Sequence, residues 1–241
     1  MSDSDFPFSY HVRRSQRALR MRIVVTQAKV EVVAPTQVSE QRIHQFVQSK
    51  QEWIVLTLAK IADSRQHYKN SAPAFYGHGA EIPYQGEMVK LIVRPTRLKR
   101  IKIEFSREFI AYIPEALLAG EYSDELKEAL IKWMKKNSKL HVEQLVHRHA
   151  AKRQLFPRTI IMKTQRSRWG SCGIHNDIHI NWLLMLAPLE VMEYVVVHEL
   201  CHIQIKNHSS YFWALVAEHL PDYQQQRHWL RKHGHRIMMG L

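Results

Sequence analysis

The sequence predicts an α+β fold, because its strand-like and helical segments are grouped rather than strictly alternating. Strand-like runs fall mainly before residue 114, and long helical runs begin near residues 39, 123 and 189. This grouping favours a strand-rich N-terminal α+β part over 1–120, which includes one long helix, and a helical part over 121–241. One continuous domain is the alternative, since 241 residues with 45% hydrophobic content can bury one substantial core or two smaller ones.

The N-terminal part is expected to begin with strands. Alternating apolar and polar residues over 8–34 predict two of them, and Ser39 predicts the N-cap of a long helix that runs to about Ala62. Short strands are then expected between residues 80 and 113, with a tight turn at Gln85-Gly86.

The C-terminal part is expected to contain two further helices. Ser123, followed by two acidic residues, predicts the N-cap of a second long helix that runs to about Leu155. A third helix is expected after Pro188, because proline suits the first helical turn. The residues that follow are apolar on most sides of this helix, which predicts that it is buried.

The most informative stretch is His198-Glu199-Leu200-Cys201-His202, which reads H-E-x-x-H. Residues four apart lie on one face of a helix, so His198 and His202 can hold one metal ion together. Glu199 follows the first of these ligands, where its carboxylate can reach a water on the metal. A carboxylate in so apolar a helix is unfavourable without a partner. Two imidazoles and an adjacent acid are the minimum set for metal-assisted hydrolysis.

His208 is the expected third ligand, and its position requires the helix to end first. A continuous helix would carry His208 roughly 240° round from His202, so that it faces away from the metal. Lys206-Asn207 offers the break, because asparagine tolerates the left-handed conformation that ends helices. Glu218, on the helix expected after Ser209-Ser210, is the alternative third ligand.

Beyond this motif, the sequence resembles the YgjP-like metallopeptidases, a family of zincins. The likeness rests on His-Glu-Leu-Cys-His, on Asn207-His208-Ser209 and Phe212-Trp213, and on Arg168-Trp169-Gly170-Ser171-Cys172. It extends from about Tyr10 to Gly234, with a more distant similarity to SprT-like proteases. The resemblance implies a cytoplasmic zinc-dependent hydrolase in which the helix over 123–155 packs beside the metal helix.

The resemblance also implies a mechanism for peptide or protein substrates. His198, His202 and His208 are expected to bind Zn²⁺ through neutral imidazole nitrogens and to leave one position for water. Glu199 is expected to act as general base toward that water and then to protonate the leaving amine. Other amide bonds could be cleaved by the same residues. Three side chains are candidate donors to the oxyanion, and the sequence does not choose among them: Arg168, Tyr194 and Tyr211.

The segment Arg168-Trp169-Gly170-Ser171-Cys172 lies between two strand-like runs and has two interpretations. It could form the edge of the active site, where Gly170 allows the close approach of a backbone and a strand edge receives an extended peptide. It could instead be structural, with Trp169 filling the core. Cys172 and Cys201 are the only cysteines. They are expected to be reduced, although a bond between them stays open.

The chain is strongly basic, with 35 Lys and Arg against 22 Asp and Glu and a net charge of +13. Much of this charge falls on ordinary solvated faces of strands and helices. The competing hypothesis is a non-catalytic, metal-stabilised module that binds nucleic acid or another polyanion through its N-terminal part. Glu199 weighs against that hypothesis, because a purely structural site needs no such acid. The best candidate surface for an anion is a cluster of five arginines: Arg13, Arg14, Arg17, Arg20 and Arg22.

The sequence contains no run of about 18 apolar residues, so no membrane span is expected. The first residues are acidic and polar and lack the basic and apolar stretches of a signal peptide, so the cytoplasm is the expected compartment.

Overall fold

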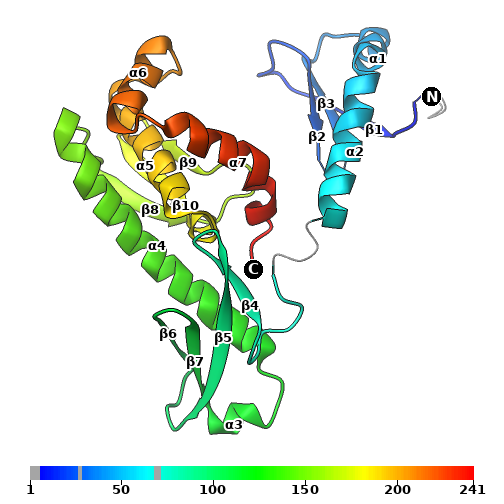
Figure 1. Ribbon diagram of the computed structural model, residues 1–241. Coiled ribbons are helices and arrows are strands. Elements are labelled where there is room, and N and C mark those ends of the chain that lie inside the picture. The colour runs from blue at the N-terminus through cyan, green and yellow to red at the C-terminus, as the bar shows by residue number, and fades with distance from the viewer. Residues whose placement is uncertain (1–5, 27–28, 68–71) are drawn as a thin grey trace. The chain divides into compact units, whose positions relative to one another are not determined.

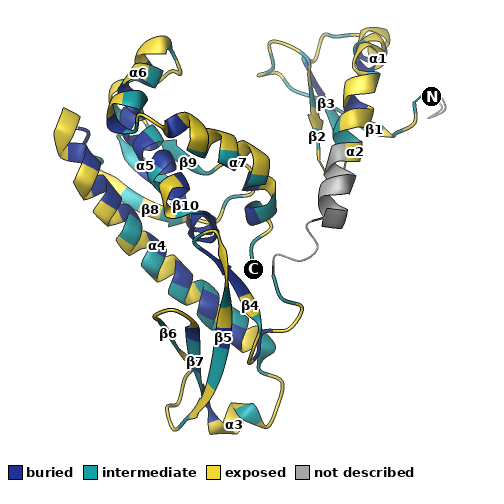
Figure 2. Ribbon diagram, in the orientation of Figure 1, coloured by how far each residue is buried: buried dark blue, intermediate teal, exposed yellow. Residues whose placement is uncertain are grey.

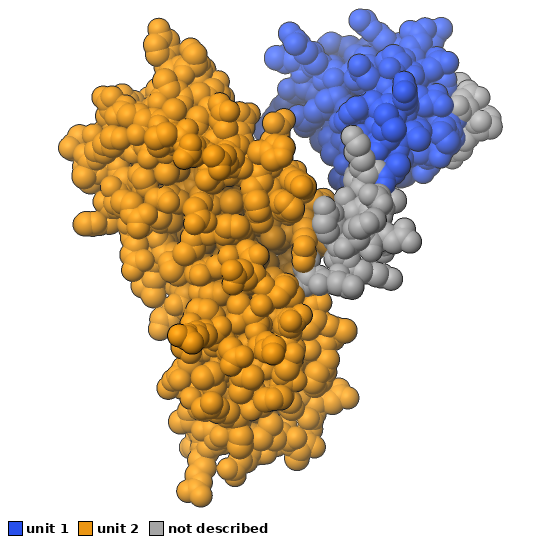
Figure 3. Space-filling view, viewed as in Figure 1, with its two compact units in different colours: residues 1–69 blue, residues 70–241 orange. Residues whose placement is uncertain are grey.

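The computed structural model describes residues 6–26, 29–67 and 72–241, and the side chains of all of these but residues 60–67. Seven α-helices and three small sheets lie within these residues, which confirms the α+β class (Figure 1). The chain divides into two compact units, Met1–Lys69 and Asn70–Leu241, coloured separately in Figure 3. This boundary differs from the division expected between residues 120 and 121.

The strands that precede residue 120 share a core with the C-terminal helices, which explains the difference. Three aromatic residues of these strands, Tyr84, Phe105 and Phe109, surround Trp133 of the long helix that follows. Their ring centroids lie 5.8, 6.0 and 5.3 Å from that of Trp133. A division at residue 120 would cut through this aromatic cluster.

The first unit is a three-stranded sheet with two helices, α1 (Glu40–Ser49) and α2 (Gln51–His67). Two strands were expected over 8–34, and the structure has three, because a turn closed by the Ala18 N–H and the Ser15 carbonyl oxygen separates the first two. The middle strand is parallel to one neighbour and antiparallel to the other. In order across the sheet, the strands are β1 (Tyr10–Arg14), β3 (Val30–Ala34) and β2 (Arg22–Val25).

The single helix expected from Ser39 to Ala62 is broken in the middle. Ser39 is the N-cap of α1 as expected, and its hydroxyl accepts a backbone N–H of the first turn. Lys50 then leaves the helical conformation, with φ −115° and ψ 6°. The hydroxyl of Ser49 donates to the carbonyl of Phe46 at 2.8 Å, a local bond of the kind that competes with the helical ladder.

The second unit begins with a four-stranded sheet. The expected turn at Gln85-Gly86 joins the first two strands, and its φ values of 49° and 86° are those of a type I′ hairpin. The two central strands are parallel, and each outer strand is antiparallel to its neighbour. In order across the sheet, the strands are β4 (Glu81–Tyr84), β5 (Glu87–Thr96), β7 (Phe109–Pro114) and β6 (Lys102–Phe105).

A short helix, α3 (Glu115–Leu118), leads to the long helix α4 (Ser123–Arg153), which ends at Gln154 in the left-handed conformation (φ 57°). Ser123 was expected to be its N-cap, but it is the first helical residue. Its hydroxyl accepts the backbone N–H of Tyr76 at 2.9 Å and so ties the start of α4 to the segment before β4.

The rest of the second unit surrounds one buried helix, α5 (Leu189–Gln204), which packs beside α4 as expected (Figure 2). Helices α6 (Ser210–His219) and α7 (Tyr223–Met238) also contact α5. A small sheet adds β8 (Thr159–Lys163), β10 (Asp177–Asn181) and β9 (Gly170–Cys172) in that order, and a 3-10 helix (Trp182–Leu186) follows. The edge strand β9 is antiparallel to β10 and contacts α5. Among the described residues, no helix is both long and apolar enough to cross a membrane.

Candidate metal centre

Helix α5 places both histidines of the H-E-x-x-H motif on one side of an otherwise buried segment. Apolar residues bury the other sides, and Val195, Val196 and Leu200 are no more than 4% exposed. His198 and His202 are partly exposed, as the predicted spacing requires of a ligand face.

The helix ends before His208, as the sequence predicted. The break comes at Ile205, which is extended (φ −124°, ψ 105°), slightly earlier than the expected Lys206-Asn207. The side-chain oxygen of Asn207 accepts the backbone N–H of Ser209 at 3.1 Å, which closes a turn around His208. This turn lets the third histidine point back toward α5.

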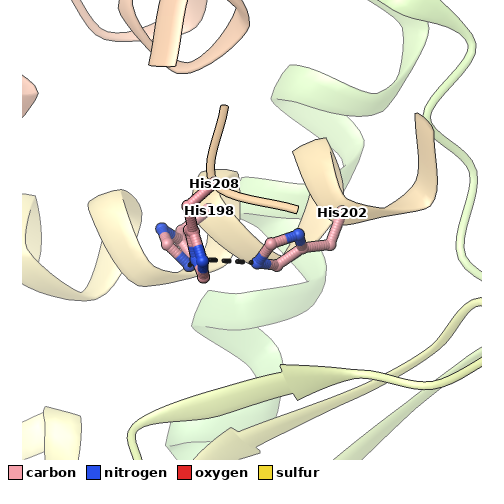
Figure 4. Close-up of side chains that lie close together, drawn as sticks. All are labelled: His198, His202 and His208. Carbon is pink, nitrogen blue, oxygen red and sulfur yellow. Dashed lines mark hydrogen bonds between the residues drawn. The ribbon is translucent and has the colours of Figure 1, made fainter. Parts of the chain in front are cut away.

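The three imidazoles converge in space. The Nε2 atom of His208 lies 3.0 Å from Nε2 of His198 and 3.2 Å from Nε2 of His202 (Figure 4). One ligand atom from each residue lies within 4.8 Å of the other two. A tetrahedral zinc ion with Zn–N distances of 2.0–2.1 Å would separate its ligand nitrogens by roughly 3.3 Å. The donor set and its spacing therefore fit zinc.

Neighbouring groups hold the imidazoles in orientation. The Nδ1–H of His202 donates to the carbonyl of Ile205 at 2.9 Å, which leaves Nε2 with a free lone pair. The ring of Phe212 stacks on that of His202, with centroids 4.5 Å apart, and Trp213 stacks on His208 at 5.7 Å. By contrast, the buried Nδ1 of His198 has no hydrogen-bond partner among the described residues.

Burial favours the neutral form of the His198 and His202 imidazoles. It is the main cause that lowers the pKa of His198 to about 3, and the neighbouring His202 and His208 lower it further. Burial also lowers the pKa of His202. Neutral imidazole is the form that binds a metal, so protons compete little for the ring nitrogens of His198 and His202 at neutral pH.

Glu199 is 5% exposed and lies against strand β9. Burial raises the pKa of its carboxyl to about 8, while the charge of Arg168 and the backbone N–H of Cys172 oppose that rise. A Cβ atom placed on Gly170 would lie 2.5 Å from Oε1 of Glu199. Gly170 is therefore needed for a close approach, but the group that approaches it is the Glu199 side chain and not the backbone that the first interpretation expected.

The buried carboxyl makes the stability of the metal-free protein depend on pH. Its pKa rises from 4.5 to about 8 on folding, so the folded state binds more protons in that window. The free energy of unfolding should therefore fall as pH rises from about 5 to about 8, by at most about 1.4 kcal/mol per pH unit. Glu199→Gln should remove this slope and stabilise the chelator-treated protein at about pH 9 but not at about pH 5. Urea unfolding at both pH values measures the free energy of unfolding of the two proteins, and the exposed Glu190→Gln is the control. The same change in free energy between pH 5 and pH 9 for wild type and Glu199→Gln would contradict the prediction.

The alternative third ligand lies elsewhere. The carboxylate of Glu218 forms a two-pronged ion pair with Arg153, with N–O distances of 2.6 and 2.9 Å. Among the described residues, the three histidines are the group of at least three potential ligands that lie close enough to hold one metal ion. Cys172 and Cys201 are both free thiols, and Cys201 is fully buried in the core.

The three candidate oxyanion donors occupy different surroundings. Tyr194 is 6% exposed and packs edge-on against His198, with centroids 5.9 Å apart. Arg168 lies near enough to Glu199 for its charge to act on that carboxyl. Tyr211 is 79% exposed in the first turn of α6. Trp169 packs toward Gly234 of α7 and against the main core, a contact that the structural interpretation of its segment expected.

Two contacts of the site could not be predicted from the sequence. The ammonium group of Lys206 donates to the side-chain oxygen of Asn176 at 3.0 Å and to the carbonyl of Gly173 at 3.3 Å. These bonds tie the loop that carries His208 to the β9–β10 hairpin. The guanidinium of Arg227, on α7, lies 4.3 Å from the ring centroid of Trp213. No spacing rule relates either cation to the motif.

Two of the five arginines in the cluster of the first unit form ion pairs. Arg13 pairs with Glu31 at 3.0 Å, and Arg14 pairs with Glu40. Within the described part of the chain, no ion pair or hydrogen bond engages the side chains of the other three: Arg17, Arg20 and Arg22.

Three convergent histidines on an α+β scaffold, with an acid beside the first, are typical of metallopeptidases. A family model agrees with this class. The model described as YgjP-like, metallopeptidase domain, matches residues 19–233, and the chain belongs to this family. The resemblance seen in the sequence is thereby confirmed. Neither the curated proteins nor the solved structures contain a match to the chain.

Proposed function

We propose that the protein is a zinc-dependent peptidase in which His198, His202 and His208 hold the metal and Glu199 is the general base. The observation that carries this proposal is the convergence of three imidazole nitrogens beside a buried carboxylate. A purely structural zinc site would need a fourth protein ligand. The described residues offer no such group at the cluster, since Glu218 is paired with Arg153.

Zinc bound at this cluster supplies a Lewis acid that lowers the pKa of water toward neutrality and polarises a carbonyl group. The protein's own contribution centres on Glu199. A cation nearby favours the ionised form of this carboxyl, so the base is formed where it is needed. Glu199 then accepts the proton of the attacking water and delivers it to the leaving amine. The absence of a side chain at Gly170 and the backbone N–H of Cys172 hold the carboxylate in place.

Strand β9 is the element that we assign to substrate binding. It is an edge strand, because only its β10 side is paired within the described sheet. It also runs beside Glu199, whose carboxyl packs on Gly170. An extended peptide could therefore add to the free edge of β9 and bring a carbonyl group to the cluster.

A peptide library tests this function. Zinc-loaded protein is expected to cleave a subset of unrelated peptides, a zinc chelator should abolish cleavage, and added zinc should restore it. Mass spectrometry of the products locates the cleaved bonds. Failure of the fully zinc-loaded protein to cleave any peptide in a diverse library would overturn the proposal.

Polyanion binding by the first unit is a second candidate, favoured by Arg17, Arg20 and Arg22, whose side chains have no ion pair in the described part of the unit. Affinity for nucleic acid should fall steeply with salt if these side chains contact phosphates. Replacing all three by glutamine should weaken binding and flatten that dependence, while Arg13→Gln should have little effect because Arg13 is paired with Glu31. Equal affinities for the triple variant and the wild type would contradict this candidate.

A further inference from the structure

An aromatic platform extends from the histidine cluster to helix α7. It consists of Trp213, Tyr223 and Tyr194. Trp213 stacks on Tyr223 with centroids 5.4 Å apart and planes inclined by 13°, and Tyr223 stacks on Tyr194 at 6.3 Å. The platform touches two of the histidines, because Trp213 stacks on His208 and Tyr194 packs edge-on against His198.

Arg227 lies on this platform one helical turn after Tyr223. Its guanidinium carbon is 4.3 Å from the centroid of the Trp213 ring, a distance typical of a cation–π contact. The His198 ring centroid is 5.8 Å from the same Trp213 ring. The guanidinium is therefore within roughly three residues of extended peptide, at ~3.3–3.6 Å per residue, of the histidine cluster.

The guanidinium of Arg227 has no hydrogen-bond acceptor among the described residues. Within residues 6–26, 29–67 and 72–241, no ion pair or hydrogen bond engages it, although it carries five N–H donors. Two acidic side chains of the surrounding helices are engaged by other residues: Glu193 pairs with Arg148 and His149, and Glu218 pairs with Arg153.

A second arginine, Arg168, also lies near the cluster. Arg168 lies beside Glu199, and in the described residues its side chain also lacks an ion pair or hydrogen bond. A guanidinium whose plane is held by an aromatic ring matches the two oxygens of a carboxylate better than a flexible lysine does. An arginine kept only for solubility would not need to be stacked beside the histidine cluster.

We propose that Arg227 binds a carboxylate of the substrate, so that the protein selects peptides with an acidic group within about three residues of the bond that is cleaved. This inference rests on the proposed peptidase function. The carboxylate can belong to an Asp or Glu side chain or to the C-terminus of the peptide, and both sources offer the same two oxygens.

Binding of matched peptides to full-length, zinc-loaded Glu199→Gln protein tests the inference without turnover. One pair of peptides differs by Glu against Gln near the centre, and a second pair differs by a free against an amidated C-terminus. The acidic member of at least one pair should bind about tenfold more tightly, and the pair that shows the preference identifies the source of the carboxylate. The preference should vanish when Arg227→Gln is added and should be partly kept with Arg227→Lys.

Arg231→Gln is the matched control, because it removes the same charge from an exposed position one turn further along α7. It should keep the preference for the acidic peptide in full. The inference would be overturned if Arg227→Gln left this preference unchanged, or if no pair of peptides showed binding or a preference.

The peptidase function and the role of Arg227 can fail separately. If the wild type cleaves acidic and neutral peptides equally well, only the proposed role of Arg227 is refuted. If the protein binds acidic peptides through Arg227 but cleaves no peptide, only the proposed peptidase function is refuted.

Discussion

Glu199→Gln is expected to retain one zinc per chain and to lose peptide hydrolysis by a factor of about 10²–10⁴, the usual contribution of a general base. Glutamine has the size of glutamate, and its amide oxygen can still accept the backbone N–H of Cys172 that the carboxyl uses. The three imidazole nitrogens are not altered by this change. His198→Ala should lose both zinc and activity, because it removes a ligand.

Initial rates and zinc content of the same purified samples measure this difference. Glu190→Gln is the control, since Glu190 is exposed at the start of the same helix. Near-normal hydrolysis by a fully zinc-loaded Glu199→Gln protein would refute the assignment of Glu199 as general base.

Gly170→Ala is expected to reduce kcat by about 10- to 100-fold while zinc remains bound, because small displacements of a catalytic group have effects of that size. The new Cβ would lie 2.5 Å from Oε1 and 2.7 Å from Cγ of Glu199, so the carboxyl must move away from its present position. The three atoms nearest to this Cβ all belong to Glu199. The effect should therefore appear in turnover rather than in metal content.

Gly173→Ala provides the matched control in the same hairpin. The nearest atom to a Cβ at Gly173 is the Asp177 carbonyl oxygen at 3.6 Å, which is an ordinary van der Waals distance. This variant should keep wild-type activity. Equal activities for the two alanine variants would show that the packing of Gly170 against Glu199 does not position the base.

The local features of the site could be predicted from the sequence because they depend on helix geometry. The four-residue spacing of His198 and His202 fixes them on one face, and the angular position of His208 requires the helix to end before it. Both features are present in the structure. The hairpin at Gln85-Gly86 was predictable for the same kind of reason, since the turn residues themselves set its backbone conformation.

Features that depend on distant packing could not be predicted. The division of the chain falls between Lys69 and Asn70 because Trp133 of α4 shares a core with strands β4, β6 and β7. The hydrophobic pattern of a strand does not reveal which helix covers it. The break of the first long helix at Lys50 could not be predicted either, because the apolar residues that suggest one helix continue on both sides of it.

The surroundings of the histidines also depend on distant packing and could not be predicted from the sequence. Gly170 could be recognised as a position that allows a close approach, but its partner Glu199 is 29 residues away in the sequence. Arg227 reaches the site only because α7 packs on α5 and places it over Trp213. Glu218 was a reasonable alternative ligand from its position after the motif, and its ion pair with Arg153 of α4 could not be foreseen.

The most direct test of the zinc site is the metal content of wild type, His208→Ala and Glu218→Gln, measured by elemental mass spectrometry after zinc is supplied and the excess is removed. About one zinc per chain is expected in the wild type and in Glu218→Gln, with loss or marked weakening in His208→Ala. Full zinc occupancy in His208→Ala, or no zinc in the wild type, would contradict the three-histidine site.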